Sequence, residues 1–459
     1  MATSTPSTKP QHAEAGKQSL GYIVVLSTIT AISGLLFGYN TAVINGVLLF
    51  LRRQFMSSNL QTEIAASSLL VGALFGAAGA SIIGDRYGRK KSLMFSAVLF
   101  AVSPLAAAAA NSVTSFSLAR LVSGLAIGLA SVLTPVYIAE ISPPENRGAL
   151  VSLNQLGIVI GILISYLSSW GLSGLGENSW RWMLGVAAGP SLLFLVGLFA
   201  IPESPRWLIS QGRSAEAEKT LVRMFGEKAA SEEMQSVNSA AGSEQGSWGE
   251  VFSPSMRKPL VVGMLLALLS QITGVNAVLY YGSVIVSEHF PGQSAGVALA
   301  ANVIIGTVNL IATILAMIFL DRWGRRIILM TASAGMAVAL AVLVIGLNVQ
   351  GAPAALMLVS ILFYVAFFAL GMGPGPWLII SEIFPTKVRG RAASIATSVL
   401  WSGALLVTFT FLSLVNTLKL WGTFAIFGAL SLLAFVFVWK AVPETKGRTL
   451  EQIQASWSK

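Results

Sequence analysis

Charged residues of opposite sign recur at the ends of the long apolar stretches of this chain. Asp85 and Arg89 follow one stretch, and Asp321 and Arg325 repeat their spacing in the second half of the chain. The full set is Asp85, Arg86, Arg89, Glu140, Arg147, Glu203, Asp321, Arg322, Arg325, Glu382, Arg389 and Glu444. A charge at the matching helix end gains about 0.3–1 kcal/mol, and arginine binds carboxylates through paired hydrogen bonds. The set predicts ion pairs that can form and break, with plain topology signals as the alternative.

Polar side chains also occur inside the apolar stretches, where each is costly unless it faces a cavity or another helix. They are Gln155, Ser270, Gln271, Asn276 and Asn309. An ideal helix separates Gln271 from Asn276 by about 140°, but Gly274 lies between them and can break the helix so that both face inward. Because amides both donate and accept hydrogen bonds, the group suits the hydroxyls of a neutral polyol.

Two tryptophans can add an aromatic surface to such a site. Trp377 ends a run of glycine and proline at 371–376 that no regular helix can hold, so a flexible break is expected beside it. Its ring can stack on the C–H face of a pyranose; the alternative is an anchor at the membrane interface. For Trp401, in the next apolar stretch, substrate contact and packing are equally open.

The elements that must position these residues are membrane helices. Of the 459 residues, 54% are apolar and only 10% are charged, whereas a soluble domain has about 25% charged residues. Twelve apolar stretches of about 20 residues can each cross the roughly 30 Å of hydrocarbon as a helix. A soluble globular protein, a disordered chain and, because cysteine is absent, a disulfide scaffold are excluded.

The 29 lysines and arginines orient the chain in the bilayer. Nearly all of them lie near the termini, in alternate connections and in the 203–258 segment, and basic connections stay in the cytoplasm. Both termini are expected in the cytoplasm, the membrane is expected to be the plasma (inner) membrane, and no signal peptide is expected. The net charge of +10 is interpreted as this topology signal and not as a nucleic-acid surface.

The positions of the apolar stretches divide the chain into five parts. The expected parts are a cytoplasmic N-tail at 1–20, a six-helix half at 21–202, a cytoplasmic linker with short amphipathic helices at 203–258, a second six-helix half at 259–443 and a cytoplasmic C-tail at 444–459. The charged motifs repeat between the halves, which indicates a duplicated unit.

Several short motifs carry a family resemblance. They include GLLFGYNTAVING at 34–46, PESPRWL at 202–208, QITGVNAVLYY at 271–281, GPGPW at 373–377 and PETKGR at 443–448. At these residues the chain resembles the sugar porter family of the major facilitator superfamily. The resemblance implies an all-α membrane protein, with twelve transmembrane helices in two six-helix halves and the major facilitator fold.

The same resemblance assigns roles to the polar residues. It implies that Gln155, Gln271, Asn276 and Asn309 bind a sugar, with Trp377 beside them. It also implies that the charged pairs latch the two halves on the cytoplasmic side during alternating access. Three positions depart from the family pattern, which usually has amides where this chain has Ser270, Leu400 and Ala404. The identity of the sugar is therefore left open.

The driving force is predicted from an absent carboxylate. Proton-coupled sugar porters carry an aspartate in the first span facing an arginine of the fourth; here the residues are Asn40 and Arg120. A second carboxylate that some symporters carry aligns with Ala187. Because an amide has no proton to exchange, we expect uniport of a monosaccharide, a hexose such as glucose, with Asn40 bonded to Arg120. A proton-coupled symporter and a non-transporting sugar sensor are the alternatives.

Enzymatic activity is not expected from this composition. The chain has two histidines, no cysteine and no nucleotide-binding loop, so we expect no metal and no cofactor. Drug efflux is disfavoured because the fifth span lacks a Gly-Pro-rich motif. The expected partners are a small sugar and the lipid bilayer; a monomer is sufficient for this function, and the oligomeric state is unknown.

Overall fold

The computed structural model describes residues 9–446, apart from short gaps at 57, 144–145, 228–229, 232–233, 235–246, 290–294, 352 and 386. All regular elements within these residues are helical. This follows from the apolar composition, because a backbone in hydrocarbon must satisfy its own N–H and C=O groups. Most of the predicted C-tail, the side chains of residues 9–19 and the side chain of Asp321 lie outside the described part.

The first half of the chain forms six spans. The helices are α1 (Lys9–Gln54), α2 (Asn59–Tyr87), α3 (Arg89–Ala108), α4 (Val113–Ile141), α5 (Arg147–Leu172) with the short η1 (Ser173–Leu175), and the pair α6 (Ser179–Gly185) and α7 (Ala188–Ala200). α1 packs along α5, and α2 packs along α4. At Gly38 an added Cβ would overlap the carbonyl oxygen of Ile158, so only glycine lets α1 approach α5 this closely.

The second half forms the remaining spans, two of which are interrupted. The helices are α12 (Pro254–Ile272), α13 (Val275–His289), α14 (Ala295–Trp323), α15 (Arg325–Asn348), α16 (Ala354–Phe367), the π-helical η2 (Phe368–Met372), α17 (Pro374–Ile383) and α18 (Arg389–Ala441). α12 continues into α13 as one span, and α16, η2 and α17 together form another.

Twelve spans are present, as the sequence predicts. Within the described residues, 11 helical segments are long and apolar enough to cross a membrane, and the last of them has 53 residues. Such a helix would be about 80 Å long, more than twice the hydrocarbon thickness. It bends at Lys419, which has φ 61° and ψ 171°. α18 therefore supplies two spans, on either side of Lys419.

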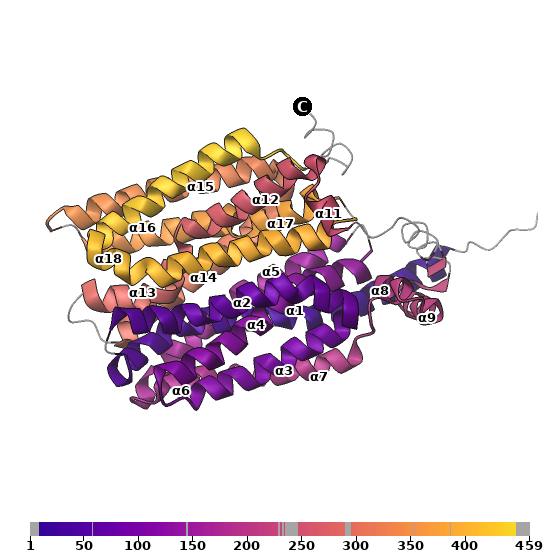
Figure 1. Cartoon of the computed structure of the whole chain (residues 1–459), viewed down its shortest axis with the longest axis horizontal. Coiled ribbons are helices and arrows are strands. Elements are labelled where there is room, and N and C mark those ends of the chain that lie inside the picture. Colours follow the sequence, from indigo (N-terminus) through magenta and orange to yellow (C-terminus); the bar gives the residue numbers. More distant parts are fainter. Residues whose placement is uncertain are drawn as a thin grey trace, which may run out of the picture.

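The spans form two bundles that lie side by side (Figure 1), one from each half of the chain. Three linker helices, α8 (Pro205–Ser210), α9 (Ser214–Phe225) and α11 (Trp248–Val251), lie at one end of the bundles. We call this end the linker end and the opposite end the far end. In α9, Ala217, Leu221 and Met224 are buried at the spacing expected of an amphipathic helix.

Candidate functional site

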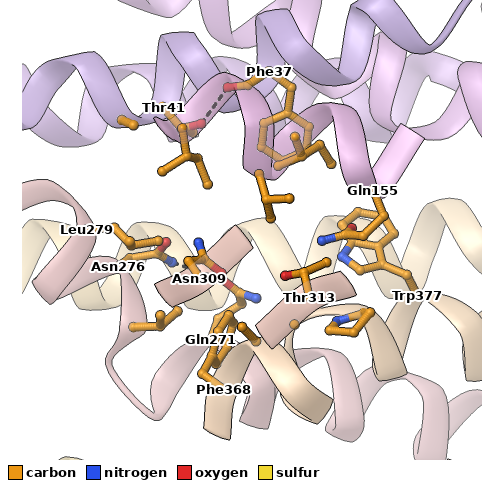
Figure 2. A pocket seen from close by; sticks show the side chains of 18 of the residues that line it. Phe37, Thr41, Gln155, Gln271, Asn276, Leu279, Asn309, Thr313, Phe368 and Trp377 are labelled. Carbon is orange, nitrogen blue, oxygen red and sulfur yellow. Dashed lines mark hydrogen bonds between the residues drawn. The ribbon is translucent and has the colours of Figure 1, made fainter. Parts of the chain in front are cut away.

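A cavity lies between the two halves at the middle of the spans. Its lining includes six of the residues selected from the sequence, which are Gln155, Gln271, Asn276, Asn309, Trp377 and Trp401. Figure 2 shows Phe37 and Thr41 of α1 on one wall, and Gln271, Asn276 and Asn309 of the second half facing them. A cavity at mid-membrane between repeats is where transporters of this architecture bind substrate.

The amides of the seventh span form a chain of hydrogen bonds. Asn276 Nδ2 donates to Gln271 Oε1 at 2.9 Å, and Gln271 Nε2 donates to Ser270 Oγ at 3.1 Å. Ser270 is 1% exposed and is not among the cavity-lining residues; its own hydroxyl donates to the Ala267 carbonyl. Ser270 therefore orients Gln271, in place of the direct sugar contact we expected. One N–H of Gln271 and the carbonyl of Asn276 stay free for a ligand.

The break predicted in this span is present. α12 ends at Ile272, α13 begins at Val275, and Gly274 between them has φ 97°. A Cβ at Gly274 would also lie 2.3 Å from the ring of Phe427. The backbone conformation and the lack of space both require glycine here, and the resulting break lets Gln271 and Asn276 face the same cavity.

The break predicted beside Trp377 is also present. The π-helical η2 replaces regular helix over Phe368–Met372, and α17 begins at Pro374. π-Helical turns are frequent at functional sites, because they shift the register of the side chains that follow. Trp377 is half-buried and lines the cavity beside Gln155 (Figure 2). This position supports the expected role of Trp377 as a stacking surface.

The cavity wall beside Trp401 is apolar. Leu400 and Trp401 both line it, and the rings of Trp401 and Phe37 are 5.4 Å apart. The indole Nε1 of Trp401 is buried with no hydrogen-bond partner among the described residues. Trp401 therefore packs across the two halves and also offers a free donor. Ala404 is 1% exposed and is not in the lining.

Some lining residues were missed by sequence reasoning. Thr41, Tyr280 and Thr313 contribute hydroxyl groups to the wall. Tyr280 and Thr313 each follow a selected amide, Asn276 and Asn309, by four residues. Side chains four residues apart lie on one face of a helix, so this spacing was a usable signal.

The expected pairing of Asn40 with Arg120 is wrong in this conformation. Asn40 Nδ2 donates to the carbonyl of Leu36, one turn back in its own helix, at 2.9 Å. Both Asn40 and Arg120 are 1% exposed, and the guanidinium nitrogens of Arg120 have no partner within the described residues. Arg120 lies within electrostatic range of Tyr280 in the cavity wall. Asn40 therefore uses its amide N–H to bond the backbone of its own helix, and Arg120 has no hydrogen-bond partner among the described residues.

The charged motifs at the linker end form ion pairs inside each half. Arg89 binds Glu140 through two hydrogen bonds of 3.1 Å and binds Asp85 at 3.1 Å. In the second half, Arg325 binds Glu382 at 3.1 Å. The pairs we find thus join helices of one bundle, which differs from the expected latch between the halves.

Two further motif acids cap helix N-termini. Glu203 accepts hydrogen bonds from the backbone N–H groups of Arg89 and Lys90 at 2.9 and 3.0 Å, at the start of α3. Glu444 does the same at the start of α15, from Arg325 and Arg326 at 2.9 and 3.1 Å. A carboxylate at this place satisfies free N–H groups and interacts favourably with the helix dipole.

The two capping acids differ in their pKa. Burial raises the pKa of Glu203 above the usual range, despite the N–H groups of Lys90, Ser204 and Arg89. Burial also acts on Glu444, but four backbone N–H groups outweigh it and lower the pKa of Glu444. Burial therefore disfavours the ionised form of Glu203 in the first half, whereas the backbone N–H groups favour the ionised form of Glu444 in the second half.

The remaining candidate gate residues surround these pairs. Arg147 donates to the Ala139 carbonyl at 3.1 Å, and Arg389 donates to the Phe384 carbonyl at 3.2 Å. Arg86 and Arg322 are exposed.

Hydrogen bonds between uncharged groups join the halves near the far end. Asn45 of α1 donates to the Leu279 carbonyl at 2.8 Å and accepts from Ser283 N–H at 3.0 Å and from Asn302 at 3.1 Å. Tyr166 of α5 also donates to the Leu279 carbonyl, at 3.0 Å. These bonds hold the two halves together beside Leu279, which also lines the cavity.

The chain is similar over nearly its whole length to known membrane transporters. The profile of the family described as "Sugar (and other) transporter" matches residues 26–457. The arabinose-proton symporter of Bacillus subtilis (strain 168) is 37% identical over 452 residues, covering 96% of each chain. A glucose transporter of Staphylococcus epidermidis is 35% identical, covering 92% of this chain and 95% of that one. The structure of a proton:xylose symporter of the major facilitator superfamily, bound to 6-bromo-6-deoxy-D-glucose, superposes with a TM-score of 0.84 at 34% identity, covering 96% and 100%.

Proposed function

Because this chain belongs to the sugar (and other) transporter family, within the major facilitator superfamily, we propose that it carries a monosaccharide across the membrane by alternating access. It is a multi-pass integral membrane protein with two bundles of six spans. The bundles rock around the cavity, so that the cavity opens to one side of the membrane at a time. By the positive-inside rule, the linker end faces the cytoplasm.

The observation that carries this proposal is the cavity of amides between the halves. Gln155, Gln271, Asn276 and Asn309 converge there with Trp377. Their donors and acceptors fit the hydroxyl groups of a neutral sugar, and the indole fits its C–H face. No acidic or basic side chain is among the lining residues that the structure describes, which favours an uncharged substrate.

The proposed substrate is a hexose such as glucose, and pentoses are the closest competitors. The relatives described above are named for arabinose, glucose and xylose. The test is counterflow in proteoliposomes preloaded with an unlabelled sugar, for a panel of labelled hexoses and pentoses. Labelled glucose should enter transiently above its external level. Binding without exchange of any sugar would contradict transport and favour the sensor.

We further propose that transport is passive. Asn40 has no proton to exchange, and Ala187 occupies the second position where symporters can carry a carboxylate. The missing bond between Asn40 and Arg120 does not alter this argument, since it rests on the chemistry of the amide. Proton symport is the second candidate, favoured by the names of two of the relatives.

A further inference from the structure

The helices of the second half differ in what they present to the cavity. α12, α13 and α14 each contribute an amide to the lining, namely Gln271, Asn276 and Asn309. Among the lining residues that the structure describes, α18 contributes Leu400 and Trp401. Polar groups in a pocket select a ligand by its hydrogen bonds, so the wall formed by α18 must select it in another way.

Three side chains form a continuous apolar part of this wall. The rings of Phe37 and Trp401 are 5.4 Å apart across the two halves. Leu400 adjoins Trp401 in sequence, lies in the same hydrophobic cluster and is 3% exposed. All three residues line the cavity. We call Phe37, Leu400 and Trp401 the apolar sector.

The apolar sector presents no hydrogen-bonding side-chain atom to a ligand. The side chains of leucine and phenylalanine have no polar atom. The Nε1 of Trp401 is unpaired among the described residues, but it is buried beneath the cavity surface. Thr41, one turn along α1 from Phe37, donates its hydroxyl to the carbonyls of Phe37 and Gly38 in its own helix (Figure 2).

The chemistry of a sugar gives this sector a consequence. A hexopyranose carries a hydroxyl or a hydroxymethyl group on every ring carbon, so the edge that faces the sector presents a hydroxyl. That hydroxyl loses its water and gains no partner, which is unfavourable. At the amides the sign is reversed, because a sugar without the matching hydroxyl leaves a buried amide unpaired.

We propose that Leu400 is a specificity-determining residue, which lets the protein accept monosaccharides that lack the hydroxyl facing the apolar sector. The proposal rests on the function proposed above and widens its substrate class from hexoses to certain deoxy sugars. Sugars that lack a hydroxyl facing the amides are rejected. Phe37 and Trp401 complete the sector, and Leu400 is the position at which one side chain can supply the missing partner.

The test compares D-glucose with the set of mono-deoxy-D-glucoses, each lacking a different hydroxyl. Binding to the purified protein is measured by isothermal titration calorimetry, whose signal does not depend on the tryptophans of the cavity. We expect most analogues to bind about 10- to 100-fold more weakly than glucose. A single analogue, the one without the hydroxyl that faces Leu400, should bind within about threefold of glucose or more tightly.

Variants at Leu400 then assign this tolerance to its side chain. L400N adds a donor and an acceptor on a similarly branched side chain, so the tolerated analogue should become about tenfold weaker relative to glucose. L400A removes volume without adding a partner and should keep the tolerance. L418N is the matched control: Leu418 is 40% exposed in the same helix and outside the lining, so every ratio should stay unchanged.

Two results overturn the proposal: a parent protein that tolerates no analogue, or an L400N protein with the parent's ratios. If L400N does not fold, the smaller L400S carries the same test, and the series in the parent still decides on its own when no analogue is tolerated. A protein that binds neither glucose nor any analogue contradicts the proposed function as well. A protein that binds glucose but tolerates no analogue contradicts only the role of Leu400.

Discussion

The two halves repeat one architecture but contribute unequally to the cavity. At the linker end, Arg89 with Glu140 and Arg325 with Glu382 are equivalent pairs. In the cavity the symmetry is lost: Gln155 is the amide that the first half contributes to the lining, whereas Gln271, Asn276 and Asn309 come from the second. The first half instead buries Arg120, whose guanidinium nitrogens have no hydrogen-bond partner among the described residues. In the transport mechanism proposed above, the second half would therefore supply most of the hydrogen bonds to the sugar.

The largest expected effect is on substrate binding. Gln271→Ala and Asn276→Ala should each weaken sugar binding about 10- to 100-fold, because each removes about 1–3 kcal/mol of hydrogen bonding to a buried hydroxyl. Gln155→Ala should cost less, about tenfold or below. Binding can be followed by intrinsic fluorescence, since Trp377 and Trp401 line the cavity.

A matched amide outside the cavity provides the control. Asn348 is exposed at the end of α15, and its side chain donates to the Val344 carbonyl. Asn348→Ala should leave binding unchanged. If Gln155→Ala weakened binding as much as Gln271→Ala, both halves would hold the sugar equally and the comparison would break down.

A smaller effect is expected on the stability of the fold. Glu203 of the first half and Glu444 of the second half should contribute to it differently. The lowered pKa of Glu444 means that its charge stabilises the fold above the pKa of the unfolded chain, and that this contribution is lost as pH falls through its folded value. The raised pKa of Glu203 has the opposite sign: its contribution is present in acid and is lost as pH rises through the folded value.

Glutamine replacements expose this difference. At pH 7, Glu444→Gln should lower the unfolding temperature by about 2–4 °C, and Glu203→Gln should lower it by less. The deficit of Glu444→Gln should shrink in acid. Thermal unfolding of the detergent-solubilised protein, followed by tryptophan fluorescence, measures both. Equal deficits with the same pH dependence would mean that the two caps are equivalent.

Much of the fold could be predicted from the sequence, since hydrocarbon imposes helices and a minimum length on every apolar stretch. The breaks at Gly274 and Pro374 were also predictable, because glycine and proline act locally. The amides of the cavity could be predicted because a polar side chain within a span is costly unless it faces a cavity or another helix. The identity of the sugar could not be predicted, because it depends on how several side chains converge in space.

The missed features depend on contacts between segments distant in sequence. In the sequence, Glu63 looks like any acid at the end of a span. In the structure, its carboxylate accepts hydrogen bonds from the N–H and the hydroxyl of Ser413, which is 350 residues away. Ser270 looks like a sugar contact until its hydroxyl is seen holding Gln271. The pairing of Asn40 with Arg120 failed because the amide has a nearer acceptor in its own helix.

Passive transport is tested most directly by the final sugar level in proteoliposomes. Labelled sugar should reach the external concentration inside, and the level should be the same with an imposed pH gradient, with a protonophore or with neither. The Asn40→Asp variant introduces a carboxylate at the position where proton-coupled sugar porters carry one, and it should make uptake depend on pH although Ala187 is unchanged. Accumulation of sugar above the external concentration in the parent protein, collapsing when the protonophore is added, would contradict passive transport and establish proton symport.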